Sequence, residues 1–154
     1  MKVGILKEIK VLEKRVCMVP AGVQTMIANG HEVVVENNAG AAIGYTNEEY
    51  IGAGATIAET PKEIYAACDM VMHVKEPQPS EYDLIRKDQI IFTYLHLAAD
   101  EQQTRALMKA RSVNIAYETI EKADGSLPLL VPMSEVAGRM AAQEGAKYLE
   151  MPQG

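Results

Sequence analysis

The chain has 154 residues, enough for one domain or for one domain with part of another. Its formal net charge of −6 at pH 7, without a basic stripe, argues against a nucleic-acid partner. No signal-peptide pattern is present and no apolar run approaches the roughly 20 residues that cross a bilayer, so we expect a cytoplasmic protein without a membrane partner. Cys17 and Cys68 lack metal-ligand spacing, so we expect reduced thiols and no metal site.

Strand-like and helix-like segments alternate along most of the chain. The strand candidates are apolar or β-branched runs at residues 2–6, 33–35, 70–74, 90–94 and 113–116. A helix opens at Pro20 and closes at Gly30 between the first two runs. Alternation roughly every 20 to 35 residues predicts a doubly wound α/β fold of flavodoxin- or Rossmann-like type, in which helices cover both faces of a mostly parallel sheet.

Further helix starts share one design, in which a capping side chain precedes a carboxylate or amide by three positions. The pairs are Thr46 with Glu49, Thr60 with Glu63, Ser80 with Asp83 and, more loosely, Asp100 with Gln103. Cap and carboxylate can satisfy free backbone amides of the first turn reciprocally. Each pair therefore predicts a helix.

A different pattern follows Glu118, where a turn and a proline-containing stretch lead into a long helix. We expect Ser134 to cap this helix, which runs over residues 135–150 and has one side lined by alanine and glycine. Such a side lets another backbone pack closely. The helix N-terminus at Ser134 is either a plain cap or an anion site able to meet a pyrophosphate or carboxylate.

Three cationic or titratable residues follow strand candidates. Because parallel strands end at one edge of the sheet, we expect Arg15, Lys75 and His96 to share a cleft there. A guanidinium binds a carboxylate with two parallel bonds, an ammonium polarises a carbonyl oxygen, and an imidazole transfers protons near neutral pH. This combination predicts a site for a small α-keto or α-amino acid.

Each of these residues also has a plainer interpretation. Arg15 could be a solvated loop charge, Lys75 half of a surface ion pair, and His96 a structural histidine. We interpret His31 and His73 as structural. No glycine-rich dinucleotide fingerprint follows a strand, so glycines of this chain do not bind a hydride carrier.

Several segments are similar to a known family. They lie at residues 1–10, 14–16, 19–23, 73–77, 92–100 and 132–140. Together they resemble the N-terminal, substrate-binding part of NAD-dependent alanine dehydrogenase, and the likeness runs the length of the chain. The family reaction converts L-alanine, water and NAD reversibly into pyruvate, ammonia and NADH.

The resemblance also implies roles for individual residues. Arg15 and Lys75 would hold pyruvate or L-alanine, with Arg15 on the carboxylate, and His96 would be the catalytic acid/base. Ser134 would contact NAD. The residues expected to line the same pocket are Tyr94, Glu118 and Met133.

Members of this family continue into a Rossmann domain that binds NAD and supplies a catalytic aspartate, and a later segment returns to complete the first domain. We therefore divide this chain into an incomplete substrate-binding catalytic domain at residues 1–130 and an interdomain helix with the start of a linker at residues 131–154. The chain alone should be inactive, and an uncovered apolar face should favour self-association or partial disorder near the C-terminal helix. The full-length protein should be a homo-oligomer, as a hexamer.

Two alternatives remain open. The N-terminal part of a nicotinamide nucleotide transhydrogenase α subunit is similar at Arg15 and Lys75, but lacks the stretch at residues 94–100 that contains His96. The other alternative is a truncated, non-catalytic module that only binds small carboxylates or only assembles.

Overall fold

The computed structural model describes residues 1–153, and Gly154, where the predicted linker stretch ends, lies outside the described residues. The chain separates into two compact units, Met1–Ala116 and Tyr117–Gly154. The division that we predict after residue 130 stays a prediction. In the part that the structure describes, the helices are too short or too polar to cross a membrane.

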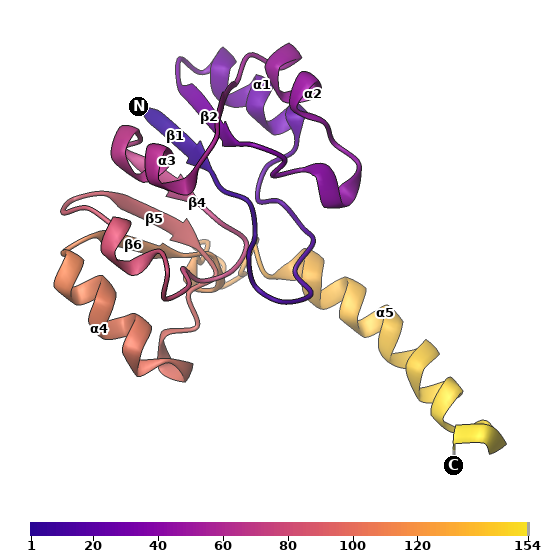
Figure 1. Ribbon diagram of the computed structural model, residues 1–154. Helices are drawn as coiled ribbons and strands as arrows, with labels where there is room; N and C mark the ends of the chain where they lie inside the picture. The colour runs from indigo at the N-terminus through magenta and orange to yellow at the C-terminus, as the bar shows by residue number, and fades with distance from the viewer. Residues whose placement is uncertain (154) are drawn as a thin grey trace. The chain divides into compact units, whose positions relative to one another are not determined.

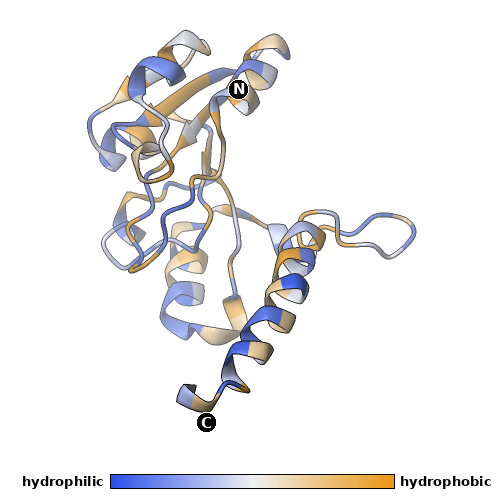
Figure 2. Ribbon diagram, turned by 90° about the vertical axis from the view of Figure 1, so that its right-hand side faces the viewer, coloured by the Kyte–Doolittle hydropathy of each residue, from blue (hydrophilic) through white to orange (hydrophobic). Residues whose placement is uncertain are grey.

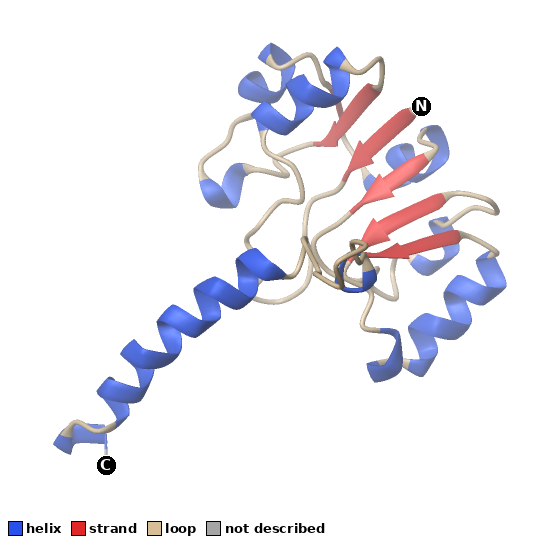
Figure 3. Cartoon of the chain, turned by 180° about the vertical axis from the view of Figure 1, so that it is seen from behind, coloured by secondary structure: helices blue, strands red, loops and turns tan. Residues whose placement is uncertain are grey.

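Unit 1 is built on a sheet of six parallel strands, whose arrows all point the same way in Figure 3. The strands are β1 (Lys2–Ile5), β2 (Glu32–Glu36), β3 (Thr56–Ala58), β4 (Met70–Met72), β5 (Ile90–Thr93) and β6 (Val113–Ala116). Their order across the sheet is β3-β2-β1-β4-β5-β6. The predicted doubly wound α/β fold is confirmed.

The strand order creates a switch point at the centre of the sheet. The chain starts at β1, moves outward to β3, and then returns to the other side of β1 to continue with β4, β5 and β6 (Figure 1). Loops after β1 and β4 therefore leave the sheet in opposite directions. Open α/β sheets bind their ligands in the crevice that forms at this position, outside the carboxyl ends of the strands.

Helices cover both faces of the sheet because successive strand residues point to opposite sides. Val34 belongs to the core beneath α3 (Pro61–Ala67) and α4 (Glu101–Ala110), to which α3 contributes Ile64. Its neighbours Val33 and Val35 belong to the core beneath α1 (Pro20–Ala28) and α2 (Asn47–Gly52). Continuous apolar strands are thus explained by burial on both faces.

Close packing of α3 on β1 depends on Gly4. A Cβ added at Gly4 would lie 2.3 Å from Cγ2 of Ile64 and 3.1 Å from Sγ of Cys68. Both neighbours are fully buried, so neither can move aside cheaply. Glycine is therefore required for helix and strand to approach this closely.

Most helix starts agree with the sequence. Thr46 forms a complete capping box with Glu49, and Thr60 and Asp100 each accept a hydrogen bond from the backbone amide three residues ahead. The helix predicted from Ser80 is wrong, because only the short 3₁₀ turn η2 (Tyr82–Leu84) forms there. The adjacent Glu81 is instead buried, with its side chain directed inward.

Two further elements differ from expectation. Strand β3 was not predicted, because it has only three residues and too little sequence for a periodic pattern. The strand expected at residues 70–74 ends at Met72, so His73 lies just beyond it rather than inside it.

Unit 2 contains the 3₁₀ turns η4 (Tyr117–Thr119) and η5 (Met151–Gln153) and the long helix α5 (Val131–Tyr148). The predicted Ser134 cap is wrong, since α5 begins at Val131 with Leu130 at the N-cap position and a proline in its first turn. The Ser134 hydroxyl donates to the Leu130 carbonyl oxygen at 3.2 Å. Polar and apolar residues alternate along α5 (Figure 2), and none of them is buried.

Candidate active site

Three loops at the carboxyl edge of the sheet carry the residues that the sequence singled out in unit 1. Arg15 lies between β1 and α1, Lys75 shortly after β4, and His96 shortly after β5. Because β1, β4 and β5 are neighbours in the sheet, the three loops leave from adjacent positions beside the switch point. We call Arg15, Lys75, Tyr94 and His96 the edge cluster.

The Arg15 guanidinium is engaged with a carboxylate of its own loop. Its Nε donates to Oε1 of Glu13 at 2.8 Å and its Nη2 donates to Oε2 at 2.7 Å. The Arg15 side chain is the main reason that the pKa of Glu13 falls from 4.5 to about 2, and the charge of Lys75 adds to the effect. Arg15 and Lys75 therefore act on the same carboxylate, with the paired geometry that a guanidinium offers.

The backbone of Lys75 is held on two sides. Its N–H faces both carboxylate oxygens of Glu8, each at 3.4 Å. Its carbonyl oxygen accepts a hydrogen bond of 2.8 Å from the hydroxyl of Thr93, a buried residue of β5. Contacts from the loop after β1 and from strand β5 thus fix the backbone from which the Lys75 side chain departs.

The side chain of His96 lies against a carboxylate. Its Nδ1 is 3.4 Å from Oε2 of Glu76, and the other oxygen of Glu76 is paired with Lys10. Burial raises the pKa of Glu76, but the hydrogen bond from Lys10 and nearby positive charge outweigh burial, and the net pKa is lowered. Among the described residues Oε2 of Glu76 makes no hydrogen bond, so its contact with His96 is electrostatic and places a negative charge beside Nδ1. The backbone of His96 is left-handed, with φ 49° and ψ 38°.

Tyr94 lies near both Arg15 and His96 of the edge cluster. Its ring centroid lies 6.2 Å from that of His96. The pKa of Arg15 is raised chiefly by Glu13, with smaller contributions from the phenol of Tyr94 and the carboxylate of Glu8. Tyr94 is therefore near both the cation and the imidazole, and its side chain is buried.

The remaining predicted site residues belong to unit 2. Glu118 lies in η4, and Met133 and Ser134 lie in the first turns of α5. Because Ser134 does not cap the helix, its hydroxyl does not mark an anion site at a helix terminus. That these three residues line the substrate pocket or contact NAD stays a prediction.

Four charged residues around the edge cluster were missed from the sequence: Lys10, Glu13, Glu8 and Glu76. From the sequence, Glu8, Lys10 and Glu13 are interpreted as part of a solvated charged loop, and Glu76 as half of a surface ion pair with Lys75. For the three loop residues, the signal that could have found them is the mixture of acidic and basic residues that precedes Arg15 at residues 7–14. Their actual partners depend on how the loops fold back over the sheet edge.

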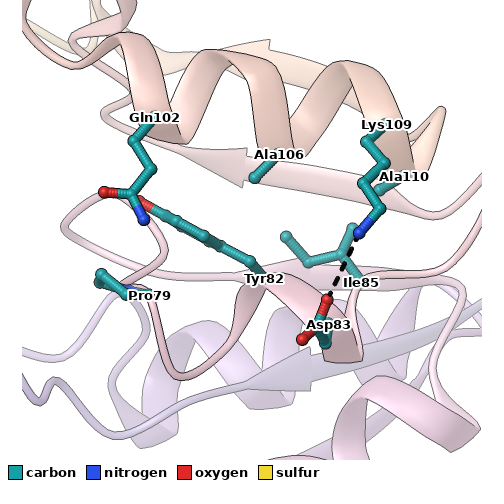
Figure 4. Close-up of a pocket in the computed structure, with 8 residues that line it drawn as sticks. All are labelled: Pro79, Tyr82, Asp83, Ile85, Gln102, Ala106, Lys109 and Ala110. Atoms are coloured by element: carbon teal, nitrogen blue, oxygen red, sulfur yellow. Dashed lines mark ion pairs between the residues drawn. The ribbon is translucent and has the colours of Figure 1, made fainter.

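A separate hollow of about 480 Å³ lies between η2 and α4 (Figure 4). It is lined by Pro79, Tyr82, Asp83, Ile85, Gln102, Ala106, Lys109 and Ala110. Tyr82 extends toward Gln102, and Asp83 and Lys109 form an exposed ion pair at 4.0 Å. None of these residues belongs to the edge cluster, and the hollow holds no grouping suited to catalysis.

The sequence matches a family model and many known proteins. The model described as "Alanine dehydrogenase/PNT, N-terminal domain" matches residues 4–137. The whole chain is 51% identical to an alanine dehydrogenase of Methanococcus maripaludis and 53% identical to one of Bacillus subtilis, covering 41% and 40% of those proteins. The chain thus spans about two fifths of the length of these relatives.

The structure is also similar to solved structures of the same kinds of protein. An L-alanine dehydrogenase structure superimposes with a TM-score of 0.93 at 47% identity, over 100% of this chain and 42% of that one. A transhydrogenase from Sinorhizobium meliloti superimposes with a TM-score of 0.72 at 26% identity, over 77% of this chain and 35% of that one. Since the family model covers most of its length, the chain belongs to the alanine dehydrogenase/PNT N-terminal domain family.

Proposed function

We propose that this chain is the substrate-binding part of an NAD-dependent L-alanine dehydrogenase. The observation that carries the proposal is the carboxylate of Glu13, which the Arg15 guanidinium holds with two bonds within reach of the Lys75 charge. A substrate carboxylate needs the same guanidinium, and the carbonyl group next to that carboxylate needs a cation close by. The higher identity and TM-score of the alanine dehydrogenase relatives favour this function over that of a transhydrogenase.

In this proposal the chain binds and orients pyruvate or L-alanine. Arg15 exchanges Glu13 for the substrate carboxylate, which fixes one end of the substrate. Lys75 stabilises the negative charge that develops on the carbonyl oxygen. His96, with the Glu76 carboxylate beside its ring, exchanges a proton at the same oxygen.

The described residues of unit 1 do not fit NAD. In a dinucleotide-binding domain, glycines after the first strand let the backbone approach the pyrophosphate. After β1 this chain instead has Lys7 and Glu8, and the Glu8 carboxylate points at the backbone amides of Val74 and Lys75. A pyrophosphate would meet this negative charge. We therefore propose that NAD is held mainly by the part of the relatives that this chain does not span.

A pyruvate titration followed by ¹⁵N NMR tests substrate binding by the 154-residue chain. We expect shifts concentrated on the Arg15 side-chain Nε–H and on the amides of Lys75 and His96. Shifts confined to the hollow around Tyr82 and Lys109, or no shifts, would contradict the proposal. The same chain should not reduce NAD in the presence of L-alanine, and measurable turnover would contradict the expectation that it is inactive alone.

Catalysis by His96 can be tested in a chimera that joins this chain to the remaining sequence of the Bacillus subtilis relative. His96→Ala should lower kcat about 100-fold or more, as loss of a general acid/base does. The control His31→Ala changes a histidine beside the chain's N-terminal amine and should leave kcat unchanged. An unchanged rate in His96→Ala would make His96 structural.

We also propose that the protein assembles as a cytoplasmic homo-oligomer, a hexamer at full length. Edge strand β6 supports assembly, because Val113 and Ile115 are 47% and 38% exposed on the same side of the sheet. An edge strand presents unpaired backbone groups on which another segment or another copy can pair. Light scattering on the chain and on the chimera measures the assembly, and a monomeric chimera would contradict the proposal.

A further inference from the structure

A buried histidine, His73, lies between two buried carboxylates beside the edge cluster. Its side chain is 2% exposed, and those of Glu8 and Glu81 are each 4% exposed. Nδ1 lies 3.5 Å from Oε1 of Glu8, at ion-pair distance but without hydrogen-bond geometry. Nε2 lies 3.2 Å from Oε1 of Glu81. His73 therefore makes electrostatic contacts with two buried carboxylates in addition to packing in the core.

Two other titratable groups face this histidine. The Tyr65 hydroxyl lies 3.3 Å from Nε2 of His73 and 3.5 Å from Oε1 of Glu81. Glu36, buried at the end of β2, accepts a hydrogen bond from the backbone of Lys7 and acts on His73 electrostatically. Burial raises the pKa of Tyr65 well above 10, so the phenol stays neutral.

The surrounding carboxylates keep the imidazole protonated. Burial by itself lowers the pKa of His73, but the contacts with Glu8 and Glu81 outweigh it and raise the pKa to about 9. At neutral pH the cluster therefore contains one buried cation between two carboxylates. Removing the cation would leave two buried negative charges without their partner.

Both carboxylates also hold the backbone that carries Lys75. Glu8 accepts a hydrogen bond of 2.5 Å from the Val74 amide and faces the Lys75 amide at 3.4 Å. Glu81 accepts a hydrogen bond of 2.8 Å from the Gln78 amide through its other oxygen. The segment at residues 74–78, which carries Lys75 and the His96 partner Glu76, is thus held at both ends.

We propose that His73 is a positioning residue: as a buried cation it holds Glu8 and Glu81 in place, and these carboxylates fix the backbone of residues 74–78 from which Lys75 reaches the substrate. His73 itself does not touch the substrate. The consequence for binding rests on the proposed function, whereas the consequence for the backbone does not.

Amide hydrogen exchange in the 154-residue chain tests the backbone step. His73→Gln removes the cation, His73→Lys keeps it, and Tyr65→Phe changes the same buried cluster without changing charge. Relative to core amides of β1, exchange at Val74, Lys75 and Gln78 should rise about tenfold or more in His73→Gln, as local opening becomes easier. His73→Lys and Tyr65→Phe should retain most of the protection.

Amide exchange measured over a range of pH provides a second test, which can be made on the wild-type chain. In the wild-type chain the protection of Val74 and Lys75, relative to β1, should fall as pH rises through about 9, where His73 loses its proton. His73→Lys should show a flatter profile over this range, because lysine holds its charge to higher pH. Glu8, Glu36, Glu81 and Tyr65 are the same in both proteins, so the difference reports the group at position 73.

Pyruvate titration connects the backbone to binding. His73→Gln should weaken pyruvate binding at least about threefold, and His73→Lys should restore it. Unchanged exchange in His73→Gln, or a loss in His73→Lys as large as in His73→Gln, would overturn the proposal. Failure of the wild-type chain to bind pyruvate would instead refute the proposed function, while the exchange data would still decide the role of His73.

Discussion

Replacing Glu13 with glutamine removes the carboxylate that occupies the Arg15 guanidinium. In the structure Glu13 takes both bonds that Arg15 would offer to a substrate, and it also feels the charge of Lys75. To use the Nε–Nη2 edge of the guanidinium, pyruvate must displace this carboxylate. Glu13→Gln should therefore strengthen pyruvate binding, because a neutral amide competes less well for the guanidinium.

The size of the effect follows from the pKa of Glu13. A fall from 4.5 to about 2 corresponds, at full value, to about 3 kcal/mol of favourable interaction. The Arg15 side chain is 48% exposed, so solvent screens the pair and reduces the usable part to about 1 kcal/mol. About 1 kcal/mol is roughly a fivefold gain in affinity for pyruvate.

Isothermal titration with pyruvate at neutral pH measures the gain. The matched control is Glu101→Gln, which removes a carboxylate bonded to Arg105 on the solvent-exposed side of α4, away from the edge cluster. The control should bind pyruvate like the wild-type chain. Weaker binding in Glu13→Gln would refute the reasoning, since it would mean that Glu13 positions Arg15 for the substrate instead of competing with it.

Other substitutions test binding, packing and charge in turn. Arg15→Lys should weaken pyruvate binding in the same titration although it keeps the charge, because lysine cannot form two parallel bonds; equal affinity would mean that charge alone is sufficient. Gly4→Ala should lower the free energy of unfolding in urea by about 2 kcal/mol, since its Cβ would overlap Ile64, whereas Gly52→Ala, with open space around it, should cost less than about 1 kcal/mol. The raised pKa of His73 stabilises the fold fully below about pH 6.5 and loses this contribution as pH rises through about 9, by up to about 3 kcal/mol in urea unfolding; a flat profile from pH 6.5 to 9.5 would contradict a buried cation there.

The fold was largely predictable because burial on both faces leaves a strong signal in the sequence. Continuous apolar strands separated by capped helices require a parallel sheet covered on both sides. Cap patterns were less reliable. Thr46 and Ser80 look alike in sequence, but Glu81 after Ser80 turns inward to His73, and the segment forms only a short turn. A capping pattern in the sequence does not show which carboxylates will instead form contacts with residues far away in the chain.

The candidate site was predictable only in part. Strand ends place Arg15, Lys75 and His96 at one edge, and this follows from the direction of parallel strands. Glu13 could not be assigned, because its position depends on a loop in which Leu12 has a φ of 68° and the Glu13 amide bonds back to Lys10. Tertiary packing selects such a conformation, and no periodicity encodes it.

The left-handed backbone of His96 has a consequence for how stability and activity trade off. A residue with a side chain is strained in this conformation by about 1 kcal/mol, whereas glycine adopts it freely. His96→Gly should therefore give a chain at least as stable as the wild type but without an imidazole at the edge of the sheet. Backbone conformation alone would favour glycine at position 96, and the proton transfer proposed for His96 would account for the histidine found there.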